Sequence, residues 1–341
     1  MPTTPNLFSR ALTRALLICG IAAAMGLTAC DDDDDVSSAA AQSNIVQLAQ
    51  GNANLSTLVA AAQKADLVST LSGSTELTVF APTNDAFSQL PAPFNNAQNI
   101  SAITDAAQIA TLRGILLYHV TAGDLDASEL QARAYTTQRP ATTGLNDNSI
   151  YISKPAAGGV IINGNTRVTQ ADVDASNGIV HVIDRVLMPP TQRISEIVVA
   201  SSTASTPQFT LLLRALQRPA AAALLTAAGN ANANLTVFAP TDAAFRALLT
   251  QLNLTSLDQV PDATLVSILQ LHIVNNARAF SSDLTNGQTV PTLNGNVTVG
   301  LANNAVTVRG AGNGTTPANV ATANVLATNG VIHVIDRVLL P

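Results

Sequence analysis

The chain has 341 residues, enough for two domains of ordinary size, and its 22 Asp and Glu against 16 Lys and Arg give a net charge of −6. An acidic chain lacks the positive surface that nucleic acids require, which excludes nucleic acid as a partner. With no Trp and only three Tyr residues, flat aromatic platforms for stacking sugars or bases are excluded as well.

The first thirty residues contain the three parts of an export signal. Arg10 and Arg14 form a basic start, residues 15–26 are apolar, and Leu-Thr-Ala-Cys follows, ending at Cys30. The apolar stretch suits a signal peptide and is too short to span a bilayer. Leu-Thr-Ala-Cys resembles the lipobox of bacterial lipoproteins, which implies cleavage before Cys30 and acylation of that residue. The alternative is an ordinary signal peptide cleaved near Ala29.

Cysteine usage supports the lipid anchor. The chain has two cysteines, and Cys19 lies in the leader, residues 1–29, that cleavage would remove. Cys30 would then have no cysteine with which to form a disulfide. Each buried methylene of an acyl chain contributes about 0.8 kcal/mol, so several chains on one residue anchor firmly. We expect a lipid-anchored envelope protein. The sequence leaves open the inner or outer membrane, and the periplasmic or exposed face.

A run of aspartates follows the predicted anchor. Residues 31–35 are all Asp, and like charges at this density repel each other and cannot pack. We therefore predict an acidic disordered tether over residues 30–43. A calcium site is the sharper alternative, but the spacing of an EF-hand is absent.

The remainder of the chain repeats itself at an interval of about 150 residues. The block LTVFAPTNDAF, from Leu77, recurs as LTVFAPTDAAF from Leu235. The block NGIVHVIDRVLMP recurs as NGVIHVIDRVLLP, and between them LLYHV recurs as LQLHI. The interval is too long for a solenoid unit and suits a whole domain. We predict two domains, residues 44–190 and 191–341, each able to fold by itself.

The first block predicts a strand followed by a helix. Leu-Thr-Val-Phe alternates apolar and polar residues, which is typical of a half-buried strand. Thr83 or Asn84 in the first copy, and Thr241 or Asp242 in the second, can cap the helix that follows.

The other segments complete the fold class. The Asn-Gly pair of the closing block indicates a turn into a continuous apolar strand, buried on both faces. Helical patterns such as residues 55–71 and 107–118 fill the first half of each copy, and strands fill the second half. This segregation predicts an α+β fold.

Together the three blocks resemble the fasciclin (FAS1) family, which is marked by motifs like TVFAPTNxAF, a Tyr-His pair on a helix, and NGxIHxIDxVLxP. The resemblance covers nearly all of residues 44–341 and implies two tandem FAS1-like domains, each a wedge-like β-sandwich with helices packed on it. It also implies a cell-surface or matrix role in adhesion. The second copy departs from the motif at Leu271, where the first has Tyr118.

The motif residues that the resemblance marks as structural or partner-binding are Tyr118, His119, His181, Asp184, His272, His333 and Asp336. All four histidines of the chain are among them, so a metal or acid–base site is the sharper alternative. No cysteine, HExxH sequence or paired carboxylate accompanies them. The histidines lie in apolar sequence, and we predict that they are buried with satisfied hydrogen bonds and hold no metal or cofactor.

Asp184 and Asp336 lie three residues after a histidine, on the opposite strand face, and are expected to pair with the adjacent arginine or to cap a turn. A Ser-His-Asp triad lacks the GxSxG elbow that would support it. We therefore predict no enzymatic activity.

Two functions follow from these observations. The first is a non-enzymatic adhesion or interaction protein, anchored through Cys30, whose two domains bind a protein or polysaccharide with added avidity. The alternative is a carrier of an apolar ligand such as a carotenoid, because the helices are rich in Ala and Leu. Colour in the purified protein would distinguish the two.

Overall fold

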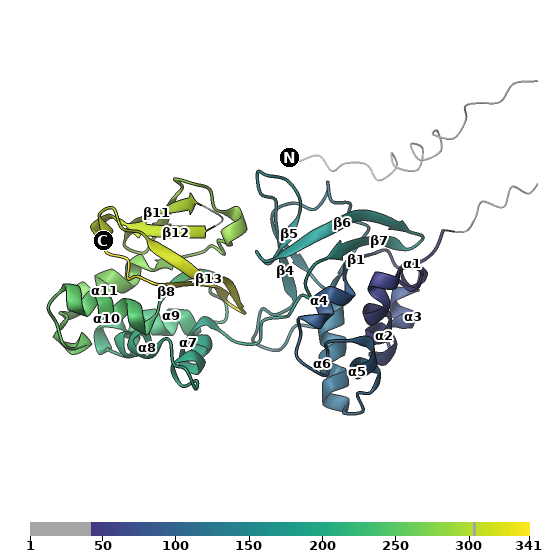
Figure 1. The fold of residues 1–341 in the computed structure, drawn as a ribbon, viewed down its shortest axis with the longest axis horizontal. Coiled ribbons are helices and arrows are strands. Elements are labelled where there is room, and N and C mark those ends of the chain that lie inside the picture. The colour runs from purple at the N-terminus through teal and green to yellow at the C-terminus, as the bar shows by residue number, and fades with distance from the viewer. Residues whose placement is uncertain (1–41, 303–304) are drawn as a thin grey trace, which may run out of the picture. The chain divides into compact units, whose positions relative to one another are not determined.

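The computed structural model describes residues 42–302 and 305–341. The predicted leader, Cys30 and the aspartate run lie outside these residues. Residues 42–341 form one compact unit that contains both repeats. Each repeat has a seven-stranded sheet with helices packed against it, in agreement with the predicted α+β fold (Figure 1).

The first repeat opens with helices and closes with strands. Its helices are α1 (Ile45–Gly51), α2 (Ser56–Lys64), α3 (Val68–Leu71), α4 (Asn84–Ser88), α5 (Ala97–Ser101) and α6 (Ala106–Leu117), with a 3-10 turn η1 (Ala53–Leu55). Its strands are β1 (Leu77–Pro82), β2 (Val120–Ala122), β3 (Ala134–Thr136), β4 (Ser149–Ser153), β5 (Ile161–Ile162), β6 (Thr166–Ala175) and β7 (Gly178–Ile183). The order across the sheet is β2-β1-β7-β6-β5-β4-β3.

The second repeat follows the same plan. Its helices are α7 (Ile194–Ser202), α8 (Thr210–Leu216), α9 (Ala222–Gly229), α10 (Asp242–Gln251) and α11 (Asp262–Leu271), with η2 (Pro219–Ala221), η3 (Leu257–Gln259), η4 (Ser281–Asp283) and η5 (Ala311–Asn313). Its strands are β8 (Leu235–Pro240), β9 (Ile273–Val274), β10 (Thr289–Thr292), β11 (Gly295–Ala302), β12 (Ala305–Gly310), β13 (Ala318–Ala327) and β14 (Gly330–Ile335). The sheet order is β10-β11-β12-β13-β14-β8-β9.

Each sheet curls until its two ends meet. In the first repeat the Gln138 amide, just after β3, donates to the Val120 carbonyl of β2 at 2.7 Å. In the second, the Leu293 amide after β10 donates to the Ile273 carbonyl of β9 at 2.9 Å. The curled sheet is the β-sandwich that the resemblance implied, because opposite parts of one sheet now face each other.

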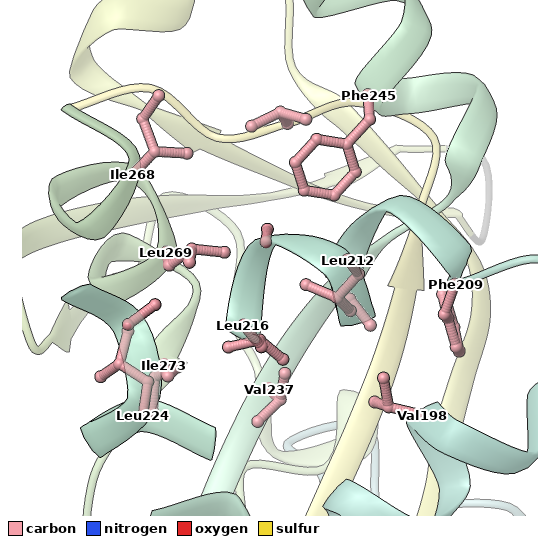
Figure 2. Close-up of a cluster of buried hydrophobic side chains, with 14 of the residues drawn as sticks. Val198, Phe209, Leu212, Leu216, Leu224, Val237, Phe245, Ile268, Leu269 and Ile273 are labelled. Atoms are coloured by element: carbon pink, nitrogen blue, oxygen red, sulfur yellow. The ribbon is translucent and has the colours of Figure 1, made fainter. Parts of the chain in front are cut away.

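The curl gives each repeat two apolar cores. In the second repeat, helices α8, α10 and α11 bury Leu212, Phe245 and Ile268 against Val237 of β8 (Figure 2). The neighbouring Phe238 points to the other face and packs inside the curled sheet. Successive side chains of a strand point to opposite faces, so one strand supplies both cores.

The opening strand of each repeat differs from the prediction. β1 and β8 were expected to be half-buried, but every residue of both strands is buried. The reason is the parallel pairing of β1 with β7, and of β8 with β14, which places the strand in the middle of the sheet between the two cores. Thr78 and Thr236, the polar residues of the alternating pattern, are buried because their hydroxyls bond to backbone.

Helix boundaries follow local chemistry. Thr83 caps α4 by accepting a hydrogen bond from the Ala86 amide, and Thr241 caps α10 in the same way, which settles the two alternatives at each position. The helix predicted over residues 55–71 is interrupted, because Asp66 adopts a positive φ of 54° between α2 and α3.

Candidate interaction surface

The histidine at the end of each long helix joins that helix to the end of its repeat. His119 is buried, its Nδ1 donates to the Ile115 carbonyl at 2.8 Å, and its Nε2 accepts from the Leu187 amide at 2.8 Å. His272 makes the equivalent pair of bonds in the second repeat. Burial lowers the pKa of both rings to about 4, so they are neutral at physiological pH.

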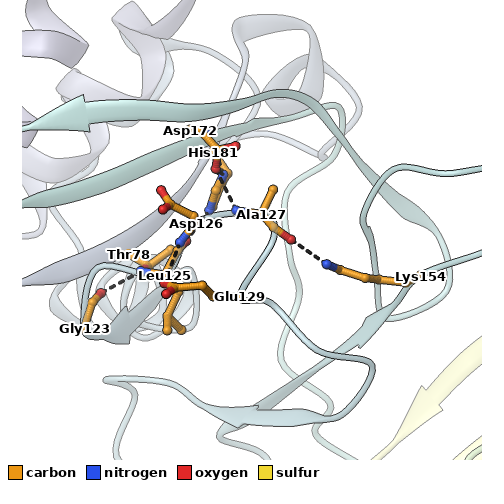
Figure 3. A network of polar contacts seen from close by, with 9 residues as sticks. All are labelled: Thr78, Gly123, Leu125, Asp126, Ala127, Glu129, Lys154, Asp172 and His181. Carbon is orange, nitrogen blue, oxygen red and sulfur yellow. Dashed lines mark hydrogen bonds and ion pairs between the residues drawn. The ribbon is translucent and has the colours of Figure 1, made fainter. Parts of the chain in front are cut away.

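The strand histidine His181 is also fixed at both nitrogens. Its ring stacks on Phe80 with centroids 5.5 Å apart, and Nε2 donates to the Leu125 carbonyl at 2.9 Å. Nδ1 accepts from the Asp172 amide at 3.2 Å (Figure 3). Burial lowers the pKa of His181, so the ring is neutral and its 3.9 Å approach to the Asp172 carboxylate is no ion pair.

His333 repeats this arrangement in the second repeat. It stacks on Phe238 with centroids 5.6 Å apart, donates to the Ala279 carbonyl at 2.8 Å and accepts from the Asn324 amide at 3.4 Å. All four histidines therefore use both ring nitrogens to bind backbone. Residues 42–302 and 305–341 contain no group of three His, Cys, Asp or Glu side chains placed to hold a metal ion.

The other motif residues also bond within their own repeat, although Asp184 is half-buried and Asp336 is exposed. Tyr118 is buried, its hydroxyl donates to the Ser149 carbonyl at 2.7 Å, and burial raises its pKa. The Asp184 carboxylate accepts from the Arg167 amide at 2.8 Å. Asp336 makes the equivalent bond to the amide of residue 319, at 2.7 Å. These aspartates join adjacent strands by accepting from a backbone amide.

Around each strand histidine the backbone forms a ledge. In the first repeat, Thr78 donates to the Gly123 carbonyl at 2.7 Å and accepts from the Leu125 amide at 2.9 Å. The Ala127 amide donates to the Asp172 carboxylate at 2.6 Å, where a bulge in β6 gives Asp172 a positive φ of 57° (Figure 3). We call residues 123–127 with Asp172 the first histidine ledge.

The second repeat has the same ledge. Thr236 donates to the Ala277 carbonyl at 2.8 Å and accepts from the Ala279 amide at 2.8 Å. The Ser281 amide donates to the Asn324 side chain at 2.8 Å, and Asn324 has a positive φ of 59°. Residues 277–281 with Asn324 form the second histidine ledge. The hydrogen bonds that build the two ledges correspond one to one.

The side chains that the two ledges present are different. Where the first ledge has Asp124, Asp126 and Asp172, the second has Arg278, Phe280 and Asn324. These positions lie outside the repeated blocks, so motif reasoning did not find them. The only sequence signal was the histidine to which each ledge is bonded.

The second ledge contacts the first repeat. The Arg278 guanidinium lies 4.7 Å from the centre of the Tyr151 ring, and the Phe280 ring centroid lies 5.7 Å from that of Tyr151. The Asn324 side-chain amide donates to the Gly164 carbonyl at 3.0 Å and to the Asn165 side chain at 2.8 Å. These receiving residues stand on β4 and on the turn between β5 and β6.

A glycine makes the close approach possible. A Cβ on Gly164 would lie 2.6 Å from the Asn324 side chain and 2.8 Å from the Phe280 ring. The first ledge, by contrast, is open to solvent: Asp124 and Asp126 are partly exposed, and the Asp172 side chain is 47% exposed. The second ledge thus belongs to an interface within the chain, and the first is the one that remains accessible.

One asparagine holds the start of each repeat in place. The Asn177 side chain accepts from the Ile45 amide at 3.0 Å and donates to the Leu71 and Gly73 carbonyls at 2.9 and 2.7 Å. Asn329 makes the equivalent bonds in the second repeat. The Asn-Gly pattern in the sequence indicates only the turns that these asparagines open.

The first repeat also contains a small apolar cavity. It lies among α1, α2, α3 and β1, is lined by residues such as Ile45, Leu58, Val79 and His119, and has a volume of about 40 Å³. A water molecule occupies about 10–15 Å³ on the same scale, so the cavity has room for only a few atoms.

Comparison with known proteins agrees with this arrangement. The fasciclin domain profile matches residues 53–189 and 207–341, which correspond to the two repeats. The chain belongs to the fasciclin family. Proteins with this domain are typically cell-adhesion or surface proteins.

Several fasciclin relatives cover one repeat or both. Protein sll1483 of Synechocystis is 40% identical over 46% of this chain and 79% of its own length. The cell surface glycolipoprotein MPB83 of Mycobacterium bovis is 35% identical over 45% of this chain and 63% of its own length. The transforming growth factor-beta-induced protein ig-h3 of Oryctolagus cuniculus is 28% identical over 80% of this chain, which spans 35% of that protein.

The chain was also compared with solved structures. The FAS1 domain pair of the insect cell adhesion molecule Fasciclin I matches with a TM-score of 0.39 and 22% identity, over 83% of this chain and 97% of that one. Within the described part of the fasciclin chain, no helix combines the length and apolar character needed to cross a bilayer.

Proposed function

We propose that this fasciclin protein is a non-enzymatic adhesion or interaction protein of the cell envelope, which presents its two domains to a protein or polysaccharide partner. One observation carries the proposal. In both repeats the histidines, and in the first repeat Tyr118, are buried and bonded internally, and the outward side chains of the ledges differ. Groups that would perform chemistry therefore hold the fold, and the exposed first ledge is the surface available to a partner.

The anchor in this proposal is a lipid on Cys30. Its support is the Leu-Thr-Ala-Cys sequence and the likeness to MPB83, which is named a cell surface glycolipoprotein. The variant Cys30→Ala should move the protein from the membrane fraction to the soluble fraction. Retention of the variant in the membrane fraction, to the same extent as the parent, would show that the anchor is something other than a lipid on Cys30.

The interaction role can be tested with the native envelope. The purified protein should bind isolated envelopes, and the double variant Asp124→Lys with Asp126→Lys should bind less, because it reverses the charge of the accessible ledge. Arg246→Glu, an exposed residue on α10, is the matched control and should bind normally. Protease treatment of the envelope distinguishes a protein partner from a polysaccharide. Equal binding by all three proteins would contradict a role for the ledge.

Carriage of an apolar ligand is the second candidate, and the apolar lining of the cavity beneath α1 is the feature that suits it. At about 40 Å³ the cavity cannot accept a carotenoid unless α1 moves away. The test is the absorption spectrum and the organic extract of protein purified from its native envelope. A stoichiometric apolar compound would support this function, and a colourless protein with an empty extract would contradict it.

A further inference from the structure

The contact inside the chain defines a pair of complementary surfaces. One is the second histidine ledge. The other, which we call the first receiving face, comprises Tyr151, Gly164 and Asn165 on β4 and the turn after β5, together with Asn163, which lines a hollow beside Asn324. Because the two repeats share one fold, each also has the other member of this pair. Two surfaces therefore have no counterpart within the chain. They are the ledge of the first repeat and the receiving face of the second repeat.

The register of the strands locates the second receiving face. In the first repeat, Tyr151 and Asn163 are opposite each other, since the Asn163 amide donates to the Tyr151 carbonyl at 2.8 Å. In the second repeat Thr298 pairs with Arg309 at the same place in β11 and β12. Arg309 thus occupies the position of Asn163, and Thr298 that of Tyr151. The second receiving face therefore carries a positive charge where the first carries none.

The part of the second receiving face around Arg309 is accessible. Arg309 is exposed, and its guanidinium donates to the Gly314 carbonyl at 2.7 Å. It borders an open hollow of about 410 Å³, lined by Thr298, Val299, Gly300, Thr307, Thr315 and Pro317. A hollow beside a single guanidinium suits an acidic, protruding partner surface.

The first histidine ledge has the matching charge. Asp124 and Asp126 are partly exposed, and their carboxylates make no hydrogen bond or ion pair with the other described residues. Asp172 adds a third carboxylate beside them. The ammonium group of Lys154 lies near and donates to the Ala127 carbonyl at 2.5 Å. The surface remains acidic, and it is built on the backbone frame that docks in the second repeat.

We propose that a second copy of this chain docks its Arg309 receiving face on the first histidine ledge, so that copies associate head to tail. The proposal rests on the interaction function above and names its partner. The supporting observations are that equivalent surfaces already meet within the chain and that the two free surfaces carry opposite charges. A head-to-tail dimer held by one contact between two different surfaces leaves one surface of each kind free, so association continues to rings or open chains.

The structure also indicates how strong this contact is. The internal contact includes the Phe280 ring, which packs against Gly164, whereas the first ledge has Asp126 at that position. In the second receiving face the corresponding Gly310 is covered, because a Cβ there would lie 2.2 Å from the Leu340 carbonyl. Association between copies is therefore electrostatic and weak, strengthened at a membrane by anchoring, and sensitive to salt.

The test uses the full mature chain with Cys30→Ala, studied by sedimentation velocity over a range of concentrations. At about 50 mM NaCl the weight-average sedimentation coefficient should rise with concentration, and about 500 mM NaCl should abolish the rise. Arg309→Glu should weaken association at least tenfold, and so should Asp124→Lys with Asp126→Lys. Arg246→Glu is the control and should behave like the parent.

Mixing the two reversed variants is the decisive step. In either variant alone, the ledge and the receiving face carry charges of the same sign and repel each other. In the mixture, the ledge of each variant meets a receiving face of opposite charge on the other variant, so association should return. Circular dichroism checks that each variant is folded. Association that is absent at low salt, equally weakened by Arg246→Glu, or not restored by mixing would overturn the proposal. If the ledge variant still loses envelope binding in those cases, the interaction function stands with another partner.

Discussion

The two repeats have the same internal frame and different ledges. His181 and His333 stack on equivalent phenylalanines and bind equivalent backbone groups, with bonds that differ by only 0.1 to 0.2 Å. At the surface of that frame, however, Asp126 in one repeat corresponds to Phe280 in the other. The comparison teaches that the histidines and phenylalanines of the frame are the same in both copies, whereas the side chains directed outward suit what each copy faces.

The difference is also one of environment. Asn324 is buried against the first repeat and uses its side-chain amide to donate there, which a carboxylate at this position cannot do. Asp172 is exposed and needs only to accept from the Ala127 amide. Asp172 and Asn324 therefore occupy the same left-handed bulge position. The side chain is an amide in the repeat where this position contacts protein, and a carboxylate in the repeat where it contacts solvent.

The largest expected effect lies in the frame. In Gly178→Ala the new Cβ would lie 1.9 Å from the Leu77 carbonyl oxygen, at a φ of 139°. We expect a loss of more than about 5 kcal/mol from the free energy of unfolding of the first repeat, seen as an unfolded repeat in thermal or urea melts. Gly123→Ala, with φ of 88° and open space, is the control and should cost about 1 kcal/mol. Similar melts for both would show that the close approach to Leu77 is absent.

The strand histidines come next. His181→Ala leaves the Leu125 carbonyl and the Asp172 amide without partners and opens a cavity, for a loss of about 3–5 kcal/mol. It should lower the melting temperature of the first repeat and leave the second nearly unchanged, and His333→Ala should do the reverse. Calorimetry of both variants is the measurement. A thermally silent His181→Ala that removes metal binding or catalytic turnover would assign these residues to chemistry.

Acid should affect both repeats alike, because the helix-end histidines have the same environment. The pKa of His119 and of His272 falls from 6.5 in the unfolded chain to about 4 in the fold. Between these values the unfolded chain binds more protons, so stability is complete above pH 6.5 and falls as the pH decreases towards about 4. The expected loss is about 3 kcal/mol per repeat.

Urea unfolding from pH 7 to pH 4 measures this dependence. His119→Gln removes one titrating ring, so the first repeat should lose stability less steeply with falling pH, while the second keeps the slope of the parent. Carboxylates titrate in the lower part of this range in both proteins and cancel in the comparison. Identical slopes in parent and variant would show that His119 has an unshifted pKa.

The smallest effect concerns the contact between the ledge and Gly164. Gly164→Ala should separate Asn324 and Phe280 from the first repeat and cost about 1–2 kcal/mol, while each repeat still folds. Faster proteolysis between the repeats, near residues 190–195, would report the loosening. Gly158→Ala is the control, because φ is 89° and nothing lies within 4 Å of its Cβ position. Equal proteolysis of both variants would contradict a stabilising contact.

Much of the fold could be predicted from the sequence because its signals are local. The Thr caps, the Asn-Gly turns and the apolar closing strands depend on residues near in the chain, and the duplication made each signal visible twice. The burial of β1 was missed, since the pattern LTVF shows alternation but not the partner strand. The interruption at Asp66 was missed because left-handed backbone in a helical pattern has no clear signal.

The amino-acid sequence by itself determined that the chain consists of two copies of one α+β module and that its histidines lie in apolar surroundings, because periodicity and repetition are properties of the chain. Only the tertiary structure decided which backbone groups the histidines bind, and that Asp126 and Phe280 occupy equivalent positions on the two ledges. These pairings join segments such as Leu125 and His181, which are far apart in sequence. Chain folding alone brings such residues together, so no local pattern could reveal the surface they form.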